Sequence, residues 1–396
     1  MNYDFDKVVP RRGTGSYKHD ALEREFGKDG LIPLWVADMD WETPPFITAA
    51  LQKRLEHSVL GYALDPVDYW PTVQQWIRYH HGWDVKRKWL GYVPGIVKGI
   101  ALVINLFVKP DEKVIVQPPI YHPFHLVPKG YGREVVWNPL RELHDSGGRL
   151  AGYEMDFEQL EQVCDEKCRL LLLANPHNPA GIVWDRETLQ RLATFAKAHN
   201  IIVVSDEIHC DMALFGYKHI PFATVSDEAA EVSITFGAPS KTFNMAGILS
   251  SWSIVPNEQL RKPFYDWLSV CELNDPALFA PIATIAALKN GEEWRQQMVK
   301  YVEGNVNFVY DYCLTHLPQV QPFRPQASYL VWLDCRALRL SHDELINLFV
   351  DKAGLALNDG ESFGPGGEGF MRLNVATPRS VLHQAMEQLR AAVESI

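Results

Sequence analysis

Three polar side chains stand at the ends of apolar runs in the middle of the chain. Lys241 closes the segment Ala-Pro-Ser-Lys, Asp206 opens Asp-Glu-Ile-His, and Asn178 lies within Asn-Pro-His-Asn-Pro-Ala-Gly. Together they offer an amine, a carboxylate and an amide. These groups suit pyridoxal 5'-phosphate (PLP). The amine can form a Schiff base with the cofactor aldehyde, the carboxylate can keep the ring nitrogen protonated, and the amide can donate to the ring hydroxyl.

Asp206 and Lys241 would have separate roles at such a site. A carboxylate beside the pyridine nitrogen favours the cationic ring, which is the stronger sink for a carbanion at the substrate α-carbon. Lys241 would first hold the cofactor and then, once substrate displaces it, act as general base at that carbon. Each signal alone is weak, because a Ser-Lys pair is usually a surface feature and Asp-Glu after a strand is usually a solvated turn. The prediction depends on finding all three in order.

The apolar runs before these residues predict a sheet. Continuous runs such as 170–173 and 201–204 are typical of strands that helices cover on both faces, as in a parallel sheet. Strands are expected at 113–117, 134–137, 169–174, 201–205, 232–236 and 250–255, with helices at 95–108 and 185–199. In an open α/β sheet, ligands bind beyond the carboxyl ends of the strands, so the three side chains are expected at one edge.

The pattern changes after about Pro276. Helices are expected at 276–289 and 292–317, short strands at 327–334 and 369–374, and a closing helix at 380–395. The sequence therefore predicts two domains. The larger, over 45–285, is an α/β domain with a mostly parallel sheet. The smaller, an α+β domain, combines 286–396 with the N-terminal segment 1–44, which is expected to pack on it or on a partner subunit.

Further candidates surround this predicted site. Gly95, Ile96 and Val97 open the first predicted helix, whose amides and dipole suit a phosphate. Tyr121 follows a strand and is expected to stack on the cofactor ring; without the other motifs, a packed core tyrosine would be the preferred interpretation. Arg372 lies in an apolar strand pattern and needs a partner. That partner is either a substrate carboxylate, bound through two hydrogen bonds, or a structural salt bridge.

Composition narrows the class of protein. The 396 residues are 47% hydrophobic and carry a formal net charge of −11, which argues against nucleic acid or an anionic membrane as the main partner. The six cysteines form no paired framework, and the N-terminus lacks the pattern of a signal peptide. A cytoplasmic protein is expected. His80 with His81, and His209 with Asp211, lack a third ligand at suitable spacing, so no metal site is expected.

The order and spacing of these motifs resemble those of fold-type I PLP enzymes of the class I/II aminotransferase superfamily. Within it, the chain is similar to the MalY/PatB branch, the carbon–sulfur lyases of cystathionine β-lyase type. The resemblance runs nearly from end to end and is carried by Arg12-Gly13-Thr14, Trp35-Val36-Ala37-Asp38-Met39-Asp40, Gly61-Tyr62, Asp206-Glu207-Ile208-His209, Ser240-Lys241-Thr242-Phe243-Asn244 and Arg372-Leu373-Asn374.

The resemblance implies a homodimer with active sites at the subunit interface. It implies that Tyr62 reaches the phosphate of the neighbouring subunit. The backbone of Ala37 would lie near the substrate carboxylate, with Arg372 as the main carboxylate anchor.

Departures from the general aminotransferase pattern also follow the branch. His209 stands where those enzymes usually have a tyrosine that contacts the ring hydroxyl. Leu249 stands where they commonly carry an arginine for the phosphate. Phosphate binding is therefore expected to depend on the Gly95–Val97 amides, Ser240 and Tyr62. The sequence does not show which way the Lys98 side chain points, nor why a histidine occupies position 19.

The leading functional prediction is PLP-dependent α,β-elimination on L-cysteine S-conjugates such as cystathionine, giving thiol, pyruvate and ammonia. The alternative is transamination of an L-amino acid, which needs the same lysine, aspartate, asparagine and arginine. A third prediction, from another class, is a PLP-binding regulatory protein. No basic helix-turn-helix precedes the domain, and the charge is negative, so this third prediction is the weakest.

Overall fold

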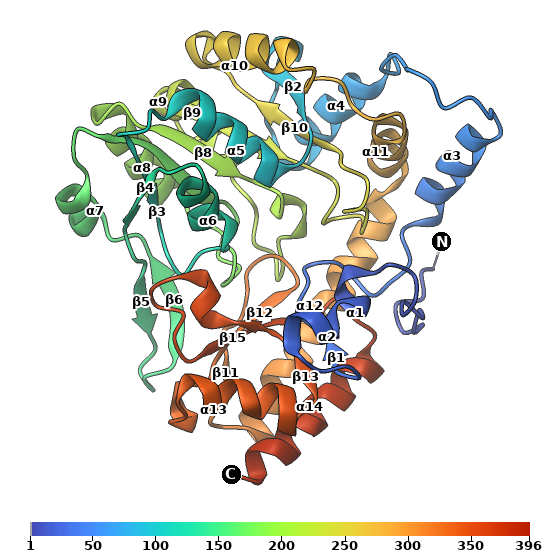
Figure 1. Ribbon diagram of the computed structural model, residues 1–396, viewed down its shortest axis with the longest axis vertical. Helices are drawn as coiled ribbons and strands as arrows, with labels where there is room; N and C mark the ends of the chain where they lie inside the picture. The colour runs from blue at the N-terminus through green and yellow to red at the C-terminus, as the bar shows by residue number, and fades with distance from the viewer. Residues whose placement is uncertain (1) are drawn as a thin grey trace.

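Two separate sheets organise the structure, a computed structural model that describes residues 2–396 (Figure 1). The larger has seven strands in the order β2-β10-β9-β8-β7-β3-β4. β10 runs antiparallel to both of its neighbours, and the remaining pairs are parallel. The expected mostly parallel sheet is confirmed. Its strands are β2 (Leu90–Val93), β3 (Lys113–Val116), β4 (Glu134–Trp137), β7 (Cys168–Ala174), β8 (Ile202–Asp206), β9 (Ser233–Gly237) and β10 (Ser251–Ile254).

The central strands are buried on both faces, as their continuous apolar runs predict. Leu171, Leu173 and Val203 pack into one core with helix α8 (Arg186–Ala198). Leu170 and Leu172 pack into another, with α5 (Ile96–Phe107) and α10 (Glu258–Val270). Successive residues of a strand point to opposite faces, so the two cores lie on the two sides of the sheet. Other helices of this part are α6 (Pro123–Gly130), α7 (Phe157–Val163) and α9 (Asp227–Val232).

Several elements escaped the sequence prediction. α10 contains Pro263, which in a sequence indicates a helix breaker. β2 is four residues long with Gly91 inside it, so its place in the sheet depends on pairing with β10 rather than on its own propensity. The elements that were not predicted also include α3 (Pro45–Leu55), α4 (Tyr69–His81), the hairpin of β5 (Arg141–His144) with β6 (Leu150–Glu154), and the helices α6, α7 and α9.

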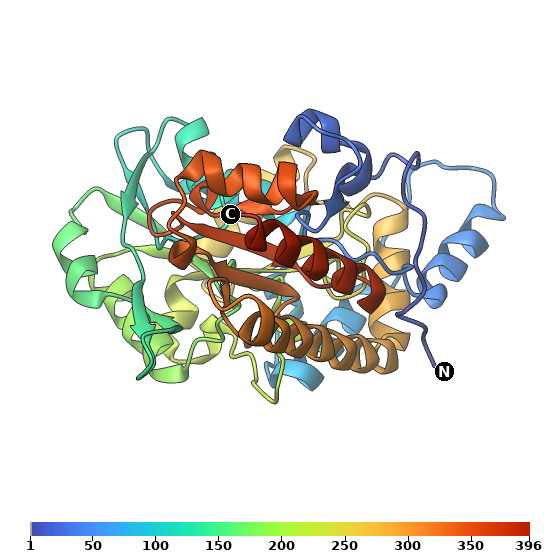
Figure 2. The same ribbon diagram turned by 90° about the horizontal axis from the view of Figure 1, so that it is seen from below.

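The smaller sheet is antiparallel, in the order β11-β12-β15-β14. Figure 2 shows helices α12 and α14 lying beside it. The strands are β11 (Gln321–Pro322), β12 (Leu330–Asp334), β14 (Asn358–Asp359) and β15 (Phe370–Asn374), and the helices are α12 (Glu292–His316), α13 (His342–Asn347) and α14 (Arg379–Glu394).

Part of the N-terminal segment packs against the C-terminal part of the chain. β1 (Ile32–Pro33) pairs in parallel with β13 (Leu355–Ala356), and two short helices precede it, α1 (Tyr17–Asp20) and α2 (Leu22–Phe26). Leu22 and Trp35 share a small core with Val350. The division of the chain at 44/45 and 285/286 stays a prediction, and its second limit falls within α11 (Phe279–Asn290).

No helix within residues 2–396 combines the length and the apolar character needed to cross a membrane.

Helix α5 lies close to the sheet at Gly99. A Cβ atom on Gly99 would stand 2.9 Å from ring atoms of Phe236, a fully buried residue of β9. This close packing sets the position of the first turn of α5 relative to the carboxyl edge of the sheet.

We therefore expect Gly99→Ala to lower the free energy of unfolding by about 1–3 kcal/mol, because the added methyl overpacks the helix–sheet contact. Chemical denaturation of the cofactor-loaded protein measures the change. Gly130→Ala is the matched control, since Gly130 is also helical and nothing lies within 4 Å of the place that its Cβ atom would take. It should be neutral or stabilising by up to about 1 kcal/mol. Equal stability of the two variants would contradict the argument.

Candidate active site

A cavity of about 280 Å³ opens at the carboxyl edge of the large sheet. The last residues of β7 and β8, Ala174 and Asp206, line it, as the rule for open α/β sheets requires. Most of the residues that the sequence singled out meet there. These are Ala37, Gly95, Ile96, Val97, Tyr121, Asn178, Asp206, His209, Ser240 and Lys241.

Lys241 is a buried amine held by a backbone carbonyl. Its Nζ donates to Ala37 O at 2.6 Å. Burial lowers the pKa of Lys241 to about 8, an effect that Asp38 and Asp206 oppose and Arg372 supports. An amine with this pKa is neutral in about half of the molecules near pH 8, so it can act as nucleophile or base there.

Asp206 is a buried carboxylate that accepts fewer hydrogen bonds than its two oxygens could. Within residues 2–396, the hydrogen bond made to its side chain is that from the Ile208 N–H, at 3.1 Å. Burial raises the pKa of Asp206 to about 7, although this hydrogen bond and Lys241 both act to lower it. A protonated ring nitrogen would supply the missing cationic donor. The carboxylate therefore fits PLP.

Asn178 and His209 face the same cavity. Asn178 Oδ1 accepts from Arg372 Nη1 at 3.0 Å, and because a guanidinium only donates, the Asn178 amide nitrogen is left to donate elsewhere. His209 Nδ1 is buried without a partner among the described residues. Burial, with Lys241 and Arg372, lowers the pKa of His209 to about 3, so the ring is neutral.

Arg372 is a buried guanidinium whose partners are all neutral. It is 2% exposed, and it donates to Asn178 Oδ1, to Trp35 O at 3.1 Å and to Asn358 Oδ1 at 2.6 Å. Its Nε finds no acceptor in residues 2–396, and no ion pair joins it to a carboxylate there. Burial lowers the pKa of Arg372 to about 10. The structural salt bridge expected as an alternative is absent from this part of the chain, which leaves a substrate carboxylate as the candidate partner.

The first turn of α5 forms the anion-binding end of the site. Gly95, at φ 112°, uses its own N–H for Ser251 Oγ and Val93 O, both at 2.9 Å. The first helical hydrogen bond is from Gly99 N–H to Gly95 O, so the N–H groups of residues 96–98 precede it and are available to a phosphate. Lys98, whose direction the sequence left open, lines the cavity, as does Leu249.

Tyr62 does not reach the cavity of its own chain. It lies on the connection between α3 and α4, which Figure 1 shows projecting from the body, and its side chain is fully exposed. Tyr121 does lie at the cavity, where its N–H donates to Asn178 O at 3.1 Å.

Sequence reasoning missed Tyr329. Its hydroxyl donates to Ala37 O at 2.9 Å, on the same carbonyl that holds Lys241, and its side chain is 1% exposed. Nothing in the residue type distinguishes it from a core tyrosine, and its partner is 292 residues away.

A second group that the sequence left aside lies behind the site. His81, Cys210 and Asp211 bring possible ligand atoms within 4.8 Å of one another. The Asp211 carboxylate already accepts from His81 at 2.9 Å, Trp76 Nε1 at 3.1 Å and Thr242 Oγ1 at 3.3 Å. These bonds connect the loop after Asp206 to the residue after Lys241. We therefore interpret the group as a network that positions both.

Comparisons with known proteins agree with this geometry. Residues 32–389 match the family described as aminotransferase class I and II. The chain is 40% identical over 391 residues to cystathionine beta-lyase PatB of Bacillus subtilis, covering 98% of this chain and all of that protein. It is 30% identical over 397 residues to protein MalY of Escherichia coli, with both chains fully covered.

Among solved structures, cystalysin from Treponema denticola, which contains a pyridoxal 5'-phosphate cofactor, superposes over the whole of both chains. The TM-score is 0.94 and the sequence identity 32%. The fold-type I architecture and the PLP cofactor expected from the sequence are thereby confirmed. The chain belongs to the class I and II aminotransferase family, and within it to the PatB/MalY branch of PLP-dependent enzymes.

Proposed function

We propose that the protein catalyses α,β-elimination on L-cysteine S-conjugates such as cystathionine. The overall reaction takes one substrate and one water and gives a thiol, pyruvate and ammonia. The observation that carries this proposal is that the Lys241 amine, whose pKa is lowered to about 8, lines the same cavity as Asn178, to which a guanidinium without a carboxylate partner among the described residues, Arg372, donates a hydrogen bond. The strong similarity to a protein named cystathionine beta-lyase supports the choice of substrate.

Each site residue has a proposed role. PLP, when bound, supplies an electron sink for charge that develops at the substrate α-carbon. Lys241 holds the cofactor, Asp206 faces its ring nitrogen, Asn178 and His209 lie on its hydroxyl side, and Tyr121 stacks on the ring. The phosphate is assigned to Gly95, Ile96, Val97 and Ser240 of the same chain. Gly95 contributes by its positive φ, which glycine adopts readily, rather than by its N–H, which is already bonded.

Two groups would act on the substrate itself. Arg372 binds the α-carboxylate through paired hydrogen bonds and so orients the α-carbon, beside the backbone of Ala37. The neutral Lys241 amine takes the α-proton, and its burial keeps bulk water from competing for that proton. The Cβ–S bond then breaks, and its electron pair leaves with sulfur as a thiolate.

Transamination is the second candidate, because it needs the same base, anchor and cofactor contacts. The two reactions part after the α-proton has moved: elimination expels a thiolate, whereas transamination returns a proton to the cofactor side. The names of PatB and its relatives favour elimination, whereas the breadth of the family leaves transamination as the outcome to test against. A purely regulatory PLP-binding protein would need neither the lowered pKa of Lys241 nor an unpaired Arg372.

The decisive assay gives the PLP-loaded protein L-cystathionine without any keto acid. We expect sustained release of pyruvate and an equal amount of thiol over many turnovers. Lys241→Ala should abolish both, because it removes the base, and should also lose the visible absorbance of lysine-bound cofactor. A single turnover that stops until a keto acid is added would show an aminotransferase instead, and an active Lys241→Ala variant would refute the role of this residue.

The pKa of Lys241 predicts its reactivity in cofactor-free protein. Only the neutral amine reacts, so labelling by an acylating reagent should rise with pH and level off above about 8. Lys113 is the internal control, because Asp165 and Glu134 raise its pKa and its labelling should still be rising beyond that point. Mass spectrometry of the labelled peptides measures both. Parallel profiles for the two lysines would contradict the effect of burial.

We also propose a homodimer in which Tyr62 completes the partner's phosphate site. The connection that bears it exposes apolar side chains in succession, which a monomer rarely leaves uncovered. These are Val59, Leu60, Tyr62, Leu64 and Val67.

Sedimentation velocity should therefore give a dimer. Tyr62→Phe should weaken PLP binding by about 10-fold or more, because a hydrogen bond to a charged phosphate is lost. Binding of pyridoxal, which has no phosphate, should be unchanged by the same substitution. A monomer, or an equal loss for both compounds, would exclude this arrangement.

A further inference from the structure

One stretch of backbone joins the base to the carboxylate anchor. Residues 35–41, here called the strap, lie against side chains from both sheets. Trp35 O accepts from Arg372, which is on β15 of the small sheet. Two residues later, Ala37 O accepts from Lys241, which follows β9 of the large sheet, and from Tyr329. The distance between the base and the anchor is therefore set through a short piece of main chain.

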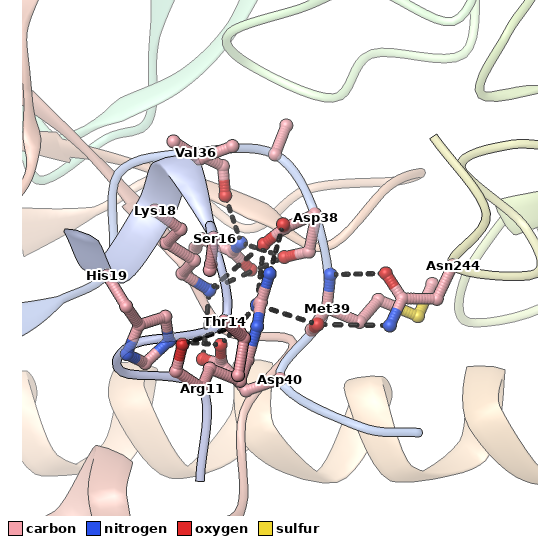
Figure 3. Close-up of polar contacts among 12 residues, drawn as sticks. Arg11, Thr14, Ser16, Lys18, His19, Val36, Asp38, Met39, Asp40 and Asn244 are labelled. Atoms are coloured by element: carbon pink, nitrogen blue, oxygen red, sulfur yellow. Dashed lines mark hydrogen bonds and ion pairs between the residues drawn. The ribbon is translucent and has the colours of Figure 1, made fainter. Parts of the chain in front are cut away.

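Two asparagines extend this grip along the strap. Asn374, two residues after Arg372, donates to Val36 O and Asp38 O, each at 2.7 Å. Asn244, three residues after Lys241, accepts from Met39 N–H and donates to Met39 O, both at 3.0 Å (Figure 3). The segments that carry Lys241 and Arg372 are thus each hydrogen-bonded to the strap, at different residues. A change in the conformation of the strap would therefore change the distance between these two side chains.

Charged residues that precede the strap in the sequence bind the two carboxylates within it and form a cluster with them. The cluster consists of Arg11, Lys18, His19, Asp38 and Asp40 (Figure 3). Lys18 is 0% exposed, and its Nζ lies 2.8 Å from Asp40 Oδ2 and 3.4 Å from Asp38 O. Arg11 binds both Asp38 oxygens, at 3.0 and 2.6 Å, and reaches Asp40 at 2.8 Å. The position of His19, which the sequence left unexplained, is accounted for by its 3.1 Å contact with Asp40.

The cluster is balanced in charge. Burial would raise the pKa of Asp40, but Lys18, His19 and Arg11 together bring it well below its usual value, so Asp40 is ionised. A buried ion pair is costly to form and costlier to break on one side, because the remaining charge loses its partner without regaining water. Two carboxylates of the strap are here matched by Arg11 and a fully buried lysine. Such an arrangement tolerates little displacement.

We propose that Lys18 is a positioning residue for catalysis: its ion pair with Asp40 fixes the strap, and the strap sets the spacing between Lys241 and Arg372. This inference rests on the proposed use of Lys241 as base and Arg372 as anchor. Lys18 touches neither the cofactor cavity nor the reacting atoms, since the strap lies between them. A misplacement of about 1 Å at such a site can cost on the order of 100-fold in rate.

The test uses the PLP-loaded protein and the variant Lys18→Met, which keeps the length of the side chain but removes its charge. We expect kcat/KM for L-cystathionine to fall by about 10- to 100-fold. The affinity for L-alanine, an amino acid with no leaving group, followed through the absorbance of bound cofactor, should fall as well. The Kd for PLP should stay within about twofold, because the proposed cofactor contacts lie on loops at the edge of the large sheet, on α5 and on Tyr62, whereas the Lys18 amine binds Asp38 and Asp40.

Two further variants separate positioning from simple stabilisation. Asp40→Asn added to Lys18→Met restores the charge balance, so the double variant should be more active than Lys18→Met alone. If Lys18→Met does not fold, Lys18→Arg and the double variant supply the comparison. Lys113→Met is the matched control, since it breaks the Lys113–Asp165 ion pair at the start of β3, outside the cavity, and should leave kcat/KM unchanged.

Unchanged kcat/KM and L-alanine affinity in folded, PLP-loaded Lys18→Met would overturn the proposal. So would a loss of activity that only follows a loss of PLP or of folded protein, because Lys18 would then be merely structural. The L-alanine titration does not depend on elimination. If the wild-type protein bound L-alanine but released no pyruvate, the proposed function would fail while the role of Lys18 could still be judged.

Discussion

The burial of unpaired charge is the constraint on which the rest of this structure depends. Asp206 and Arg372 are buried and Lys241 is half-buried, and each lacks part of the partner set that a charge in a protein interior needs. Such groups raise the free energy of the folded state. Rigid, well-packed structure around them is needed to keep their side chains from moving toward one another or toward water. The continuous apolar strands β7, β8 and β9, with a helical core on each face, provide that surround.

The charges are also kept apart by topology. Asp206 ends a strand of the large sheet, Lys241 follows the next strand along, and Arg372 belongs to the other sheet altogether. Asp206 and Arg372 would neutralise each other if they met, and the site would lose both its ring partner and its anchor. Asn178 accepts a hydrogen bond from Arg372. This neutral partner satisfies one donor of the guanidinium without cancelling its charge. Amide and carbonyl partners thus leave the charge available to a ligand.

Local signals account for what the sequence could predict. Apolar runs with no polar interruption located β7 and β8 within a residue of their ends, and Asp185 marked the start of α8, where its side chain accepts from Thr188 N–H. Asn178 and Asp206 could be found because they lie at the ends of such runs, and Lys241 because it follows the alternating strand β9; the sheet edge then brings them together. Other features depend on contacts between distant parts of the chain. β2 is specified by its pairing with β10. The roles of Tyr329 and Lys18 can be recognised only from their hydrogen bonds to the strap.

The parallel pairing of β1 with β13 and the strap contacts of Arg372 and Asn374 join the beginning of the chain to its end. During synthesis, the large sheet can form once β10 has emerged, whereas the strap must wait for β15, among the last strands made. Closing so long a loop is entropically costly and slow compared with local pairing. A nascent chain would therefore be able to bind the cofactor before it could bind an amino acid, and only a chain translated past β15 would be able to do both.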